Sequence, residues 1–141
     1  EEREPPAVML SALGIDSYLH ARKGRAWIIE LASRDQVEAL RPNIAAMTPG
    51  EHKVTVTAAC SGEYDFVSRF FSPGEAVWED PVTGSAHTML IPYWSAKLGK
   101  TQLLARQVSA RGGDIRCQLK GERVLMSGQA VTYLNGVITL R

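Results

Sequence analysis

The chain has 141 residues, of which 45% are hydrophobic, and a formal net charge of +1 at pH 7. This length suits one domain, and a chain of this size can bury roughly two-thirds of its unfolded surface, enough for an independent core. The nearly neutral charge argues against strong attraction to nucleic acid or acidic membranes, so we expect neither as a partner.

The first third of the chain combines short helices with one hairpin. Residues 1–6 are charged and proline-bearing, which is typical of a linker. The predicted elements that follow are a short helix at 5–13, a hairpin of 17–22 and 25–32 turning at Lys23-Gly24, a helix at 34–40 begun by a Ser33/Gln36 capping box, and a further helical turn after Pro42 to about Met47.

The rest of the chain is rich in strand signals around one long helix. Alternating valine and threonine predict a strand at 53–60, and a second strand at 64–71 follows the Ser61-Gly62 turn. A helix is predicted at 85–98. Glycines separate the strands predicted after it, which are 102–110, 113–119, 122–127, 129–134 and 136–140.

The helix at 85–98 is apolar on nearly every side. It carries no Asp, Glu, Lys or Arg between Ser85 and Ala96, and Pro92 inside it costs roughly 3 kcal/mol of helix propensity. A helix that is apolar all round must be buried all round, and the many strands offer the cover. We therefore predict an α+β fold in which a strongly curved mixed or antiparallel sheet wraps around one central buried helix.

The nine residues 79–87 carry the most chemistry. Asp80 lies four residues before Gly84-Ser85, where the apolar helix begins. A helix start presents unpaired N–H groups and the positive end of the helix dipole, so the backbone of Gly84, Ser85 and Ala86 can hold an anion beside a proton-transfer group. The alternative is structural: Asp80-Pro81 starts a turn, and Thr83 or Ser85 caps the helix.

Several separate motifs occur in the order found in one known family. Together they resemble the signature of the phenazine-biosynthesis PhzF-like isomerase family, from about residue 5 to the C-terminus. The segments that carry the resemblance are Tyr64-Asp65-Phe66-Val67-Ser68-Arg69-Phe70-Phe71-Ser72-Pro73, Glu79-Asp80-Pro81-Val82-Thr83-Gly84-Ser85-Ala86-His87, Pro92-Tyr93-Trp94, Leu98-Gly99-Lys100, Gln107-Val108-Ser109-Ala110-Arg111-Gly112-Gly113 and Ser127-Gly128-Gln129-Ala130-Val131.

The resemblance implies half of a larger protein. Members of the family have two similar domains of the diaminopimelate-epimerase-like fold facing each other across a cleft, and residues 7–141 are similar to the second domain. The Ser-Glu-Thr and Cys-Gly-His motifs of the first domain do not occur. By resemblance, the whole is an isomerase without a cofactor that acts on a small carboxylate-bearing metabolite. By the same resemblance, Asp80 works with a Glu of the missing N-terminal domain. Because this half alone lacks that Glu, it is expected to be inactive by itself.

Arg69 and His87 each have a functional and a structural interpretation. Arg69 can hold a substrate carboxylate or fix the 79–85 loop, and we favour the structural role. His87, in the first helical turn, is near the cleft by resemblance, but a satisfied core histidine is the favoured interpretation. Gln107, Ser109 and Arg111 are weak candidates for the rim of a cleft, while His20 and His52 carry no motif.

Cys60 and Cys117 lack metal-site spacing, and the three histidines complete no zinc set, so no metal is expected. Glycine-rich phosphate loops are also missing. Without a signal peptide or a membrane-length apolar run, we expect free thiols and a cytoplasmic location, although a disulfide and a lost targeting segment stay open. The rival functions are an amino-acid racemase or epimerase that uses thiols and a non-catalytic binding or interaction domain. A homodimer of two facing copies is a further hypothesis.

Overall fold

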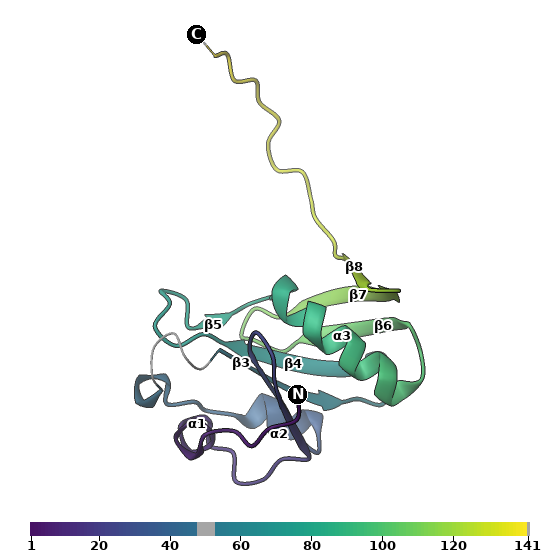
Figure 1. The fold of residues 1–141 in the computed structure, drawn as a ribbon. Helices are drawn as coiled ribbons and strands as arrows, with labels where there is room; N and C mark the ends of the chain where they lie inside the picture. Colours follow the sequence, from purple (N-terminus) through teal and green to yellow (C-terminus); the bar gives the residue numbers. More distant parts are fainter. Residues whose placement is uncertain (48–52, 141) are drawn as a thin grey trace.

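The computed structural model describes residues 1–47 and 53–140 (Figure 1). His52 lies outside the described residues. The elements in chain order are α1 (Ala7–Leu13), β1 (His20–Lys23), β2 (Trp27–Glu30), α2 (Arg34–Ala39), the 3-10 turn η1 (Ile44–Ala46), β3 (Val54–Ala59), β4 (Phe66–Phe71), β5 (Glu79–Asp80), α3 (Gly84–Leu98), β6 (Gln102–Gln107), β7 (Gly113–Lys120) and β8 (Arg123–Ser127).

Within the described ranges, the eight strands form one mixed sheet in the order β1-β2-β3-β4-β6-β7-β8, with β5 paired to β4 off this path. The β2–β3 and β4–β6 pairs are parallel, and the others are antiparallel. The sheet does not close on itself. The α+β class and the mixed sheet agree with the sequence-based expectation.

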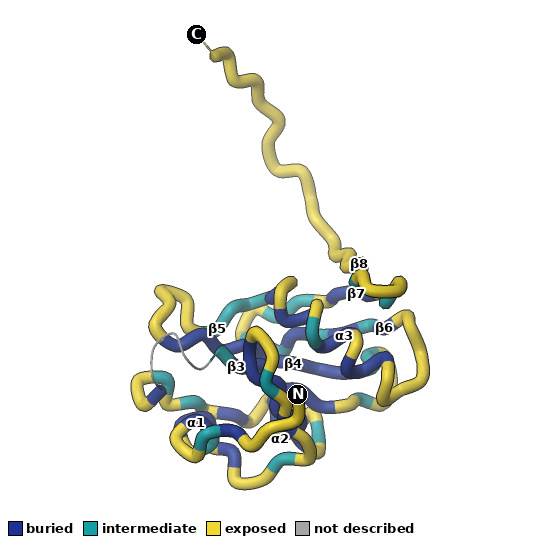
Figure 2. Tube along the Cα trace, viewed as in Figure 1, coloured by how far each residue is buried: buried dark blue, intermediate teal, exposed yellow. Residues whose placement is uncertain are grey.

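The sheet separates two apolar cores. One contains α1 and α2 with Val54, Val56 and Phe71, and the other contains α3 with Phe66 and Ile115. Alternate residues of β3 and β4 face opposite cores because side chains alternate along a strand. Both strands are therefore buried on both faces, as Figure 2 shows for the centre of the sheet.

Aromatic packing and a buried ionic contact hold α3 on its face of the sheet. The Trp94 ring stacks on Phe66 with centroids 5.6 Å apart, and its indole N–H donates to Thr57 Oγ1 at 3.1 Å. The Tyr93 hydroxyl donates to the buried Glu30 carboxylate, which Lys97 Nζ approaches to 2.5 Å. These polar groups satisfy one another, so the helix has a fixed position along its axis.

The prediction that α3 is buried on every side is not confirmed. Thr88, Pro92 and Ala96 are exposed along one side of the helix. These residues are uncharged and lie four positions apart, so they form one stripe of the helix surface. The sequence pattern could not separate this stripe from a buried face, because uncharged small residues and proline suit either environment. The strongly curved, wrapping sheet is likewise not confirmed.

Most predicted elements are confirmed, including the Lys23-Gly24 hairpin and the Ser33 cap, whose hydroxyl accepts the Gln36 N–H at 3.3 Å. The strands predicted at 129–134 and 136–140 are wrong. Residues 128–140 have no secondary structure, are exposed, and extend away from the sheet (Figures 1 and 2). Strand propensity needs a neighbouring strand to pair with, and this segment has none in the described structure.

The first residues, expected to be a linker, run along β1. Glu2 forms a bridge with Arg22, and the Arg3 N–H donates to the Ala21 carbonyl at 3.2 Å. The Lys23 N–H donates to the Glu1 carbonyl at 2.9 Å. The β1 edge of the sheet is therefore covered by the chain itself. Separately, none of the helices in the described ranges is long and apolar enough to cross a membrane.

Candidate functional site

The site arises where β4 changes partners along one edge. Its first half pairs with β6, and Ser68 lies opposite Gln107. Its last residues pair with β5, and Phe70 lies opposite Asp80. The ends of β5 and β6 therefore meet beside Arg69, and the chain leaves β5 there to start α3. This topology brings Asp80, the start of α3 and Gln107 together, although they are distant in sequence.

Arg69 anchors β5 on the face opposite to Asp80. Its guanidinium donates to both carboxylate oxygens of Glu79, at 2.7 and 3.0 Å, in a pair that is nearly buried. It also donates to the carbonyl of Leu40, at 2.9 Å, and to that of Val37, at 3.3 Å, at the end of α2. A bidentate pair of this kind has a fixed geometry. Arg69 is thus engaged in holding Glu79, next to Asp80, and α2.

Asp80 lies on the α3 side of the sheet. It pairs across from Phe70, whose side chain packs with Ala86 of the helix. The carboxylate is half-buried, and its Oδ2 accepts a hydrogen bond from Thr83 Oγ1 at 2.8 Å. This bond ties the carboxylate to the residue immediately before the helix, while the other carboxylate oxygen accepts no hydrogen bond from the described residues.

Gln107 braces the loop between Asp80 and the helix. Its side chain is fully buried. The amide oxygen accepts the Thr83 N–H at 2.8 Å, and the amide nitrogen donates to the Asp80 carbonyl at 2.5 Å and to Thr83 Oγ1 at 3.1 Å. Ser109 adds a bond from its hydroxyl to the Pro81 carbonyl at 2.9 Å. Together these bonds fix the main chain from Asp80 to Thr83.

Sequence reasoning gave Gln107 only a weak place on a rim. A signal was present: Leu103 and Ala105 are the buried positions of β6, and Gln107 continues that alternation. A glutamine at a core position of a strand must find hydrogen-bond partners inside the protein, because an unpaired buried amide is costly. That pattern identifies a buried polar brace, but it does not say which loop is braced.

No side chain of the described residues caps the start of α3. The predicted alternative, capping by Thr83 or Ser85, is therefore wrong. The Thr83 hydroxyl is engaged with Asp80 and Gln107 instead. The first N–H groups of a helix have no acceptor inside the helix, so those of Gly84, Ser85 and Ala86 need an outside partner. Gly84 and Ser85 are exposed, whereas Ala86 is buried. This end of α3 has the electrostatic character of an anion site.

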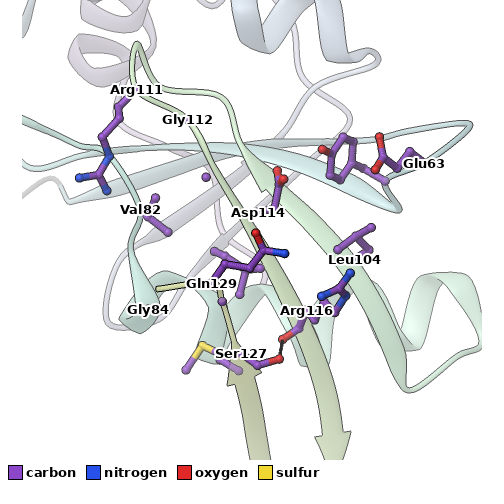
Figure 3. Close-up of a pocket in the computed structure, with 15 residues that line it drawn as sticks. Glu63, Val82, Gly84, Leu104, Arg111, Gly112, Asp114, Arg116, Ser127 and Gln129 are labelled. Carbon is purple, nitrogen blue, oxygen red and sulfur yellow. Dashed lines mark hydrogen bonds between the residues drawn. The ribbon is translucent and has the colours of Figure 1, made fainter. Parts of the chain in front are cut away.

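A hollow of about 560 Å³ opens beside the helix start (Figure 3). Val82 and Gly84 line one side of it, and Figure 3 shows Arg111 on that side. Gly113 also lines the hollow, and a Cβ there would collide with Val82 Cγ2, so the close approach of the two segments requires glycine. Asp80 does not line the hollow; it precedes the lining residue Val82 by two positions in the chain.

The opposite wall of the hollow comes from the end of the folded sheet. Ser127, Gly128 and Gln129 line it, with Arg116 and Asp114 from β7. Figure 3 shows Gln129 projecting across the hollow between these groups. One wall of the hollow therefore depends on the first residues of the extended C-terminal segment.

His87 lies in the first turn of α3 but inside the protein. Its Nδ1 lies 2.7 Å from the Thr83 carbonyl, which can only accept, so Nδ1 is the donor; Nε2 finds no partner among the described residues. The ring lies 6.0 Å from that of Phe66. Burial lowers the pKa of His87, and the hydrogen bond to Thr83 offsets this only in part. The structure therefore places His87 as a neutral core residue.

We expect His87 to make folding stability depend on pH. Its folded-state pKa lies below the unfolded value, so the unfolded chain binds a proton first as the pH falls. Its contribution is complete above about pH 7 and is lost as the pH falls below about 6.5 and through the folded pKa. Urea unfolding at several pH values should show this loss in the wild type. His87→Asn, which keeps a donor toward Thr83, should flatten it; an unchanged pH dependence would contradict the expectation.

Neither cysteine offers a ready thiolate. Both lie in the described part of the chain without forming a disulfide. Burial raises the pKa of Cys117 to about 11, and burial also raises the pKa of Cys60. Cys60 packs against the α1–α2 core and Cys117 belongs to the α3 core, on the other face of the sheet. Among the residues with described positions, no group of three or more His, Cys, Asp or Glu gathers to hold a metal.

Comparison with known proteins shows that the chain is similar to proteins that are named isomerases. An uncharacterized isomerase of Pseudomonas aeruginosa is 42% identical over 135 residues, covering 96% of this chain and 52% of that protein. An uncharacterized isomerase of Halalkalibacterium halodurans is 39% identical over 142 residues, covering 99% of this chain and 54% of that protein. This chain thus spans about half the length of these relatives.

The fold also matches that of a solved structure. The solved structure of a PhzF-family phenazine biosynthesis protein from Enterococcus faecalis matches with a TM-score of 0.86 and 38% identity, over 95% of this chain and 52% of that chain. The family model for phenazine biosynthesis-like proteins matches residues 15–136. The chain belongs to the phenazine biosynthesis-like (PhzC-PhzF) family, which confirms the resemblance seen in its motifs.

Proposed function

We propose that this chain is the C-terminal half of a cofactor-independent isomerase that moves a proton on a small carboxylate-bearing metabolite. One observation carries the proposal: α3 begins without a side-chain cap, and Asp80 is held beside that start by Thr83 and Gln107. Relatives that cover most of this chain and are named isomerases support the reaction class.

In this proposal the substrate carboxylate accepts hydrogen bonds from the N–H groups at Gly84, Ser85 and Ala86. Removing a proton from the neighbouring carbon increases the negative charge on that carboxylate, and the helix start stabilises the increase. Asp80 serves as acid or base, since a carboxylate can do both in successive steps. Its free oxygen is available for proton transfer because Thr83 occupies only Oδ2.

The remaining half of a two-domain protein is the proposed partner. Residues 7–141 would form one wall of the cleft, and residues 1–6 would lead to the other domain. That domain would supply the second wall and the main acid–base group, so this half alone should lack turnover, because reacting groups must be held on both sides of the substrate. We also propose a cytoplasmic location, which the two free thiols favour.

A screen of small carboxylic acids against this chain tests whether the start of α3 binds a carboxylate. A ligand that binds the folded state raises the melting temperature by mass action. Gly84→Pro removes one N–H from the helix start, and proline is tolerated at the first helical position. Since a hydrogen bond to a charged group contributes about 1.5–3 kcal/mol, this variant should bind the acid roughly 10- to 100-fold more weakly.

Gly84→Ala is the matched control. It keeps the N–H, and a Cβ at this position meets no atom within 4 Å. Both variants should melt like the wild type without ligand. If Gly84→Pro binds carboxylates as tightly as Gly84→Ala, the helix start is not the carboxylate-binding site, and the proposal fails. A domain that binds carboxylates, within a protein that exchanges no carbon-bound proton with deuterated water, would instead be a non-catalytic binding module.

A further inference from the structure

Two acidic residues are adjacent in β5, and the candidate site uses only one of them. Asp80 lies on the α3 side of the sheet, and Glu79 lies on the opposite side, because side chains alternate along a strand. β5 is only two residues long and pairs, among the described strands, with β4 alone. A one-residue change in its register would exchange the faces of the two carboxylates. Backbone pairing over so short a strand is a weak safeguard against that exchange.

Arg69 supplies a stronger constraint on Glu79. The Arg69 side chain is 10% exposed and that of Glu79 is 13% exposed, and the guanidinium donates to both carboxylate oxygens. The same guanidinium donates to carbonyl groups at the end of α2, and its central carbon lies 5.0 Å from the centre of the Phe71 ring. Arg69 is therefore fixed in place. If Glu79 turned to the other face, it would leave a buried charge without its partner, which is strongly destabilising.

The main chain at Asp80 is thus held from both directions. On its carbonyl side, the Gln107 amide donates to the Asp80 main-chain oxygen. On its amide side, Glu79 is held by Arg69. The peptide groups on both sides of a Cα set the direction of its side chain, so neither contact alone fixes the Asp80 carboxylate. The bond from the Thr83 hydroxyl adds one contact to the carboxylate itself.

We propose that Arg69 and Glu79 are a positioning pair, which selects Asp80 as the carboxylate of the site and directs it at the substrate. This inference rests on the proposed function, in which Asp80 transfers the proton. Neither member of the pair contacts the substrate. The role goes beyond anchoring a strand, because loss of the pair should lower turnover even where the fold stays stable and carboxylate binding stays intact.

The double variant Arg69→Met with Glu79→Leu tests this role in the protein that carries both halves. Apolar replacement of a buried ion pair is often neutral or stabilising, so the melting temperature should stay near that of the wild type. Turnover is read as solvent deuterium incorporated into the carboxylic acid found in the screen. It should fall about 10- to 100-fold, since a displacement of about 1 Å can have that effect. The loss should appear in kcat, with KM changed by less than about 2-fold.

Arg69→Lys is a second variant with the same expected pattern, because it keeps the buried charge but cannot make the bidentate contact. Arg34→Met with Glu38→Leu is the matched control. That pair has the same 2.7 Å contact between Nε and Oε1, but it is exposed on α2, so its loss should leave turnover unchanged.

Asp80→Asn, added to each background, tests whether the pair acts through Asp80. Without the Asp80 carboxylate, removing the pair should change turnover by less than about 3-fold, since two residues that act as a unit are not additive. Acetate binding to this chain, followed by the amide NMR signals of Gly84 and Ser85, should be the same with and without the pair.

Wild-type turnover in the double variant and in Arg69→Lys overturns the positioning role and leaves the proposed function standing. A full further loss in the Asp80→Asn background also overturns it. So does a parallel weakening of acetate binding, because the pair would then hold the whole loop and not the Asp80 carboxylate. The proposed function fails separately, if Asp80→Asn alone keeps full turnover.

Discussion

Asp80→Asn should lower the turnover of the protein carrying both halves by about 10²- to 10⁴-fold, the usual contribution of a general acid or base. Asparagine keeps an oxygen that can accept the Thr83 hydroxyl, so the loop should stay in place. The measurement is incorporation of solvent deuterium into the carbon skeleton of a substrate found in the carboxylate screen. Asp16→Asn, at an exposed position elsewhere, is the control.

The same substitution should act in the opposite direction on binding. A carboxylate bound at the helix start lies near the negative charge of Asp80, and two unit charges at about 4 Å in water repel by about 1 kcal/mol. Removing one should therefore tighten carboxylate binding to this chain about 3- to 5-fold, measured by calorimetry. Weaker binding together with unchanged turnover would make Asp80 a binding residue and not a proton-transfer group.

Gln107→Leu should have the largest effect on stability. Leucine fills a similar volume but leaves the Thr83 N–H and the Asp80 carbonyl without their partner. Each unpaired buried group costs about 1–3 kcal/mol, so we expect a loss of roughly 2–5 kcal/mol in the free energy of unfolding. In a chain of this length that lowers the melting temperature by about 5–15 °C. Carboxylate binding should weaken too, because the loop before α3 loses its brace.

Gln102→Leu is the matched control, since it makes the same exchange on the same strand at an exposed position. Its melting temperature should change by only a degree or two. If Gln107→Leu is as stable as this control, the loop does not depend on the glutamine. Gln107→Glu gives a finer test: it keeps an acceptor for Thr83 but places a carboxylate against the Asp80 carbonyl, so it should destabilise the fold as well.

The predicted site and the observed site agree where the information is local. The run 79–87 identified the start of α3 because a change from turn residues to an unbroken apolar run is visible in nine residues. The hydrogen-bond partners of the Thr83 hydroxyl could not be predicted from those nine residues. Thr83 is a good cap by residue type, but its hydroxyl instead donates to Asp80 and accepts from the Gln107 amide, and Gln107 lies 24 positions further along the chain.

The role of Arg69 was open for the same reason. A guanidinium on a strand beside a loop can hold a substrate or a protein carboxylate with equal chemistry. The register of β4 against β5 decides between them, because it places Glu79 on the face of Arg69 and Asp80 on the other. The sequence 79–80 contains two acids in a row, and only the pleat of the paired strand assigns one to structure and the other to the site.

By itself, the sequence determined the α+β class, the order of the helices and strands up to Ser127 except for the short strand β5, and the helix start beside Asp80. These follow from hydrophobic period and turn residues, which act over a few neighbouring positions. The tertiary structure decided which edge of the sheet stays open and which side of α3 faces water. It also decided that residues 128–140 have no described strand to pair with. Those outcomes depend on whether a segment distant in sequence supplies a hydrogen-bonding and packing partner, and a local sequence pattern does not identify that partner.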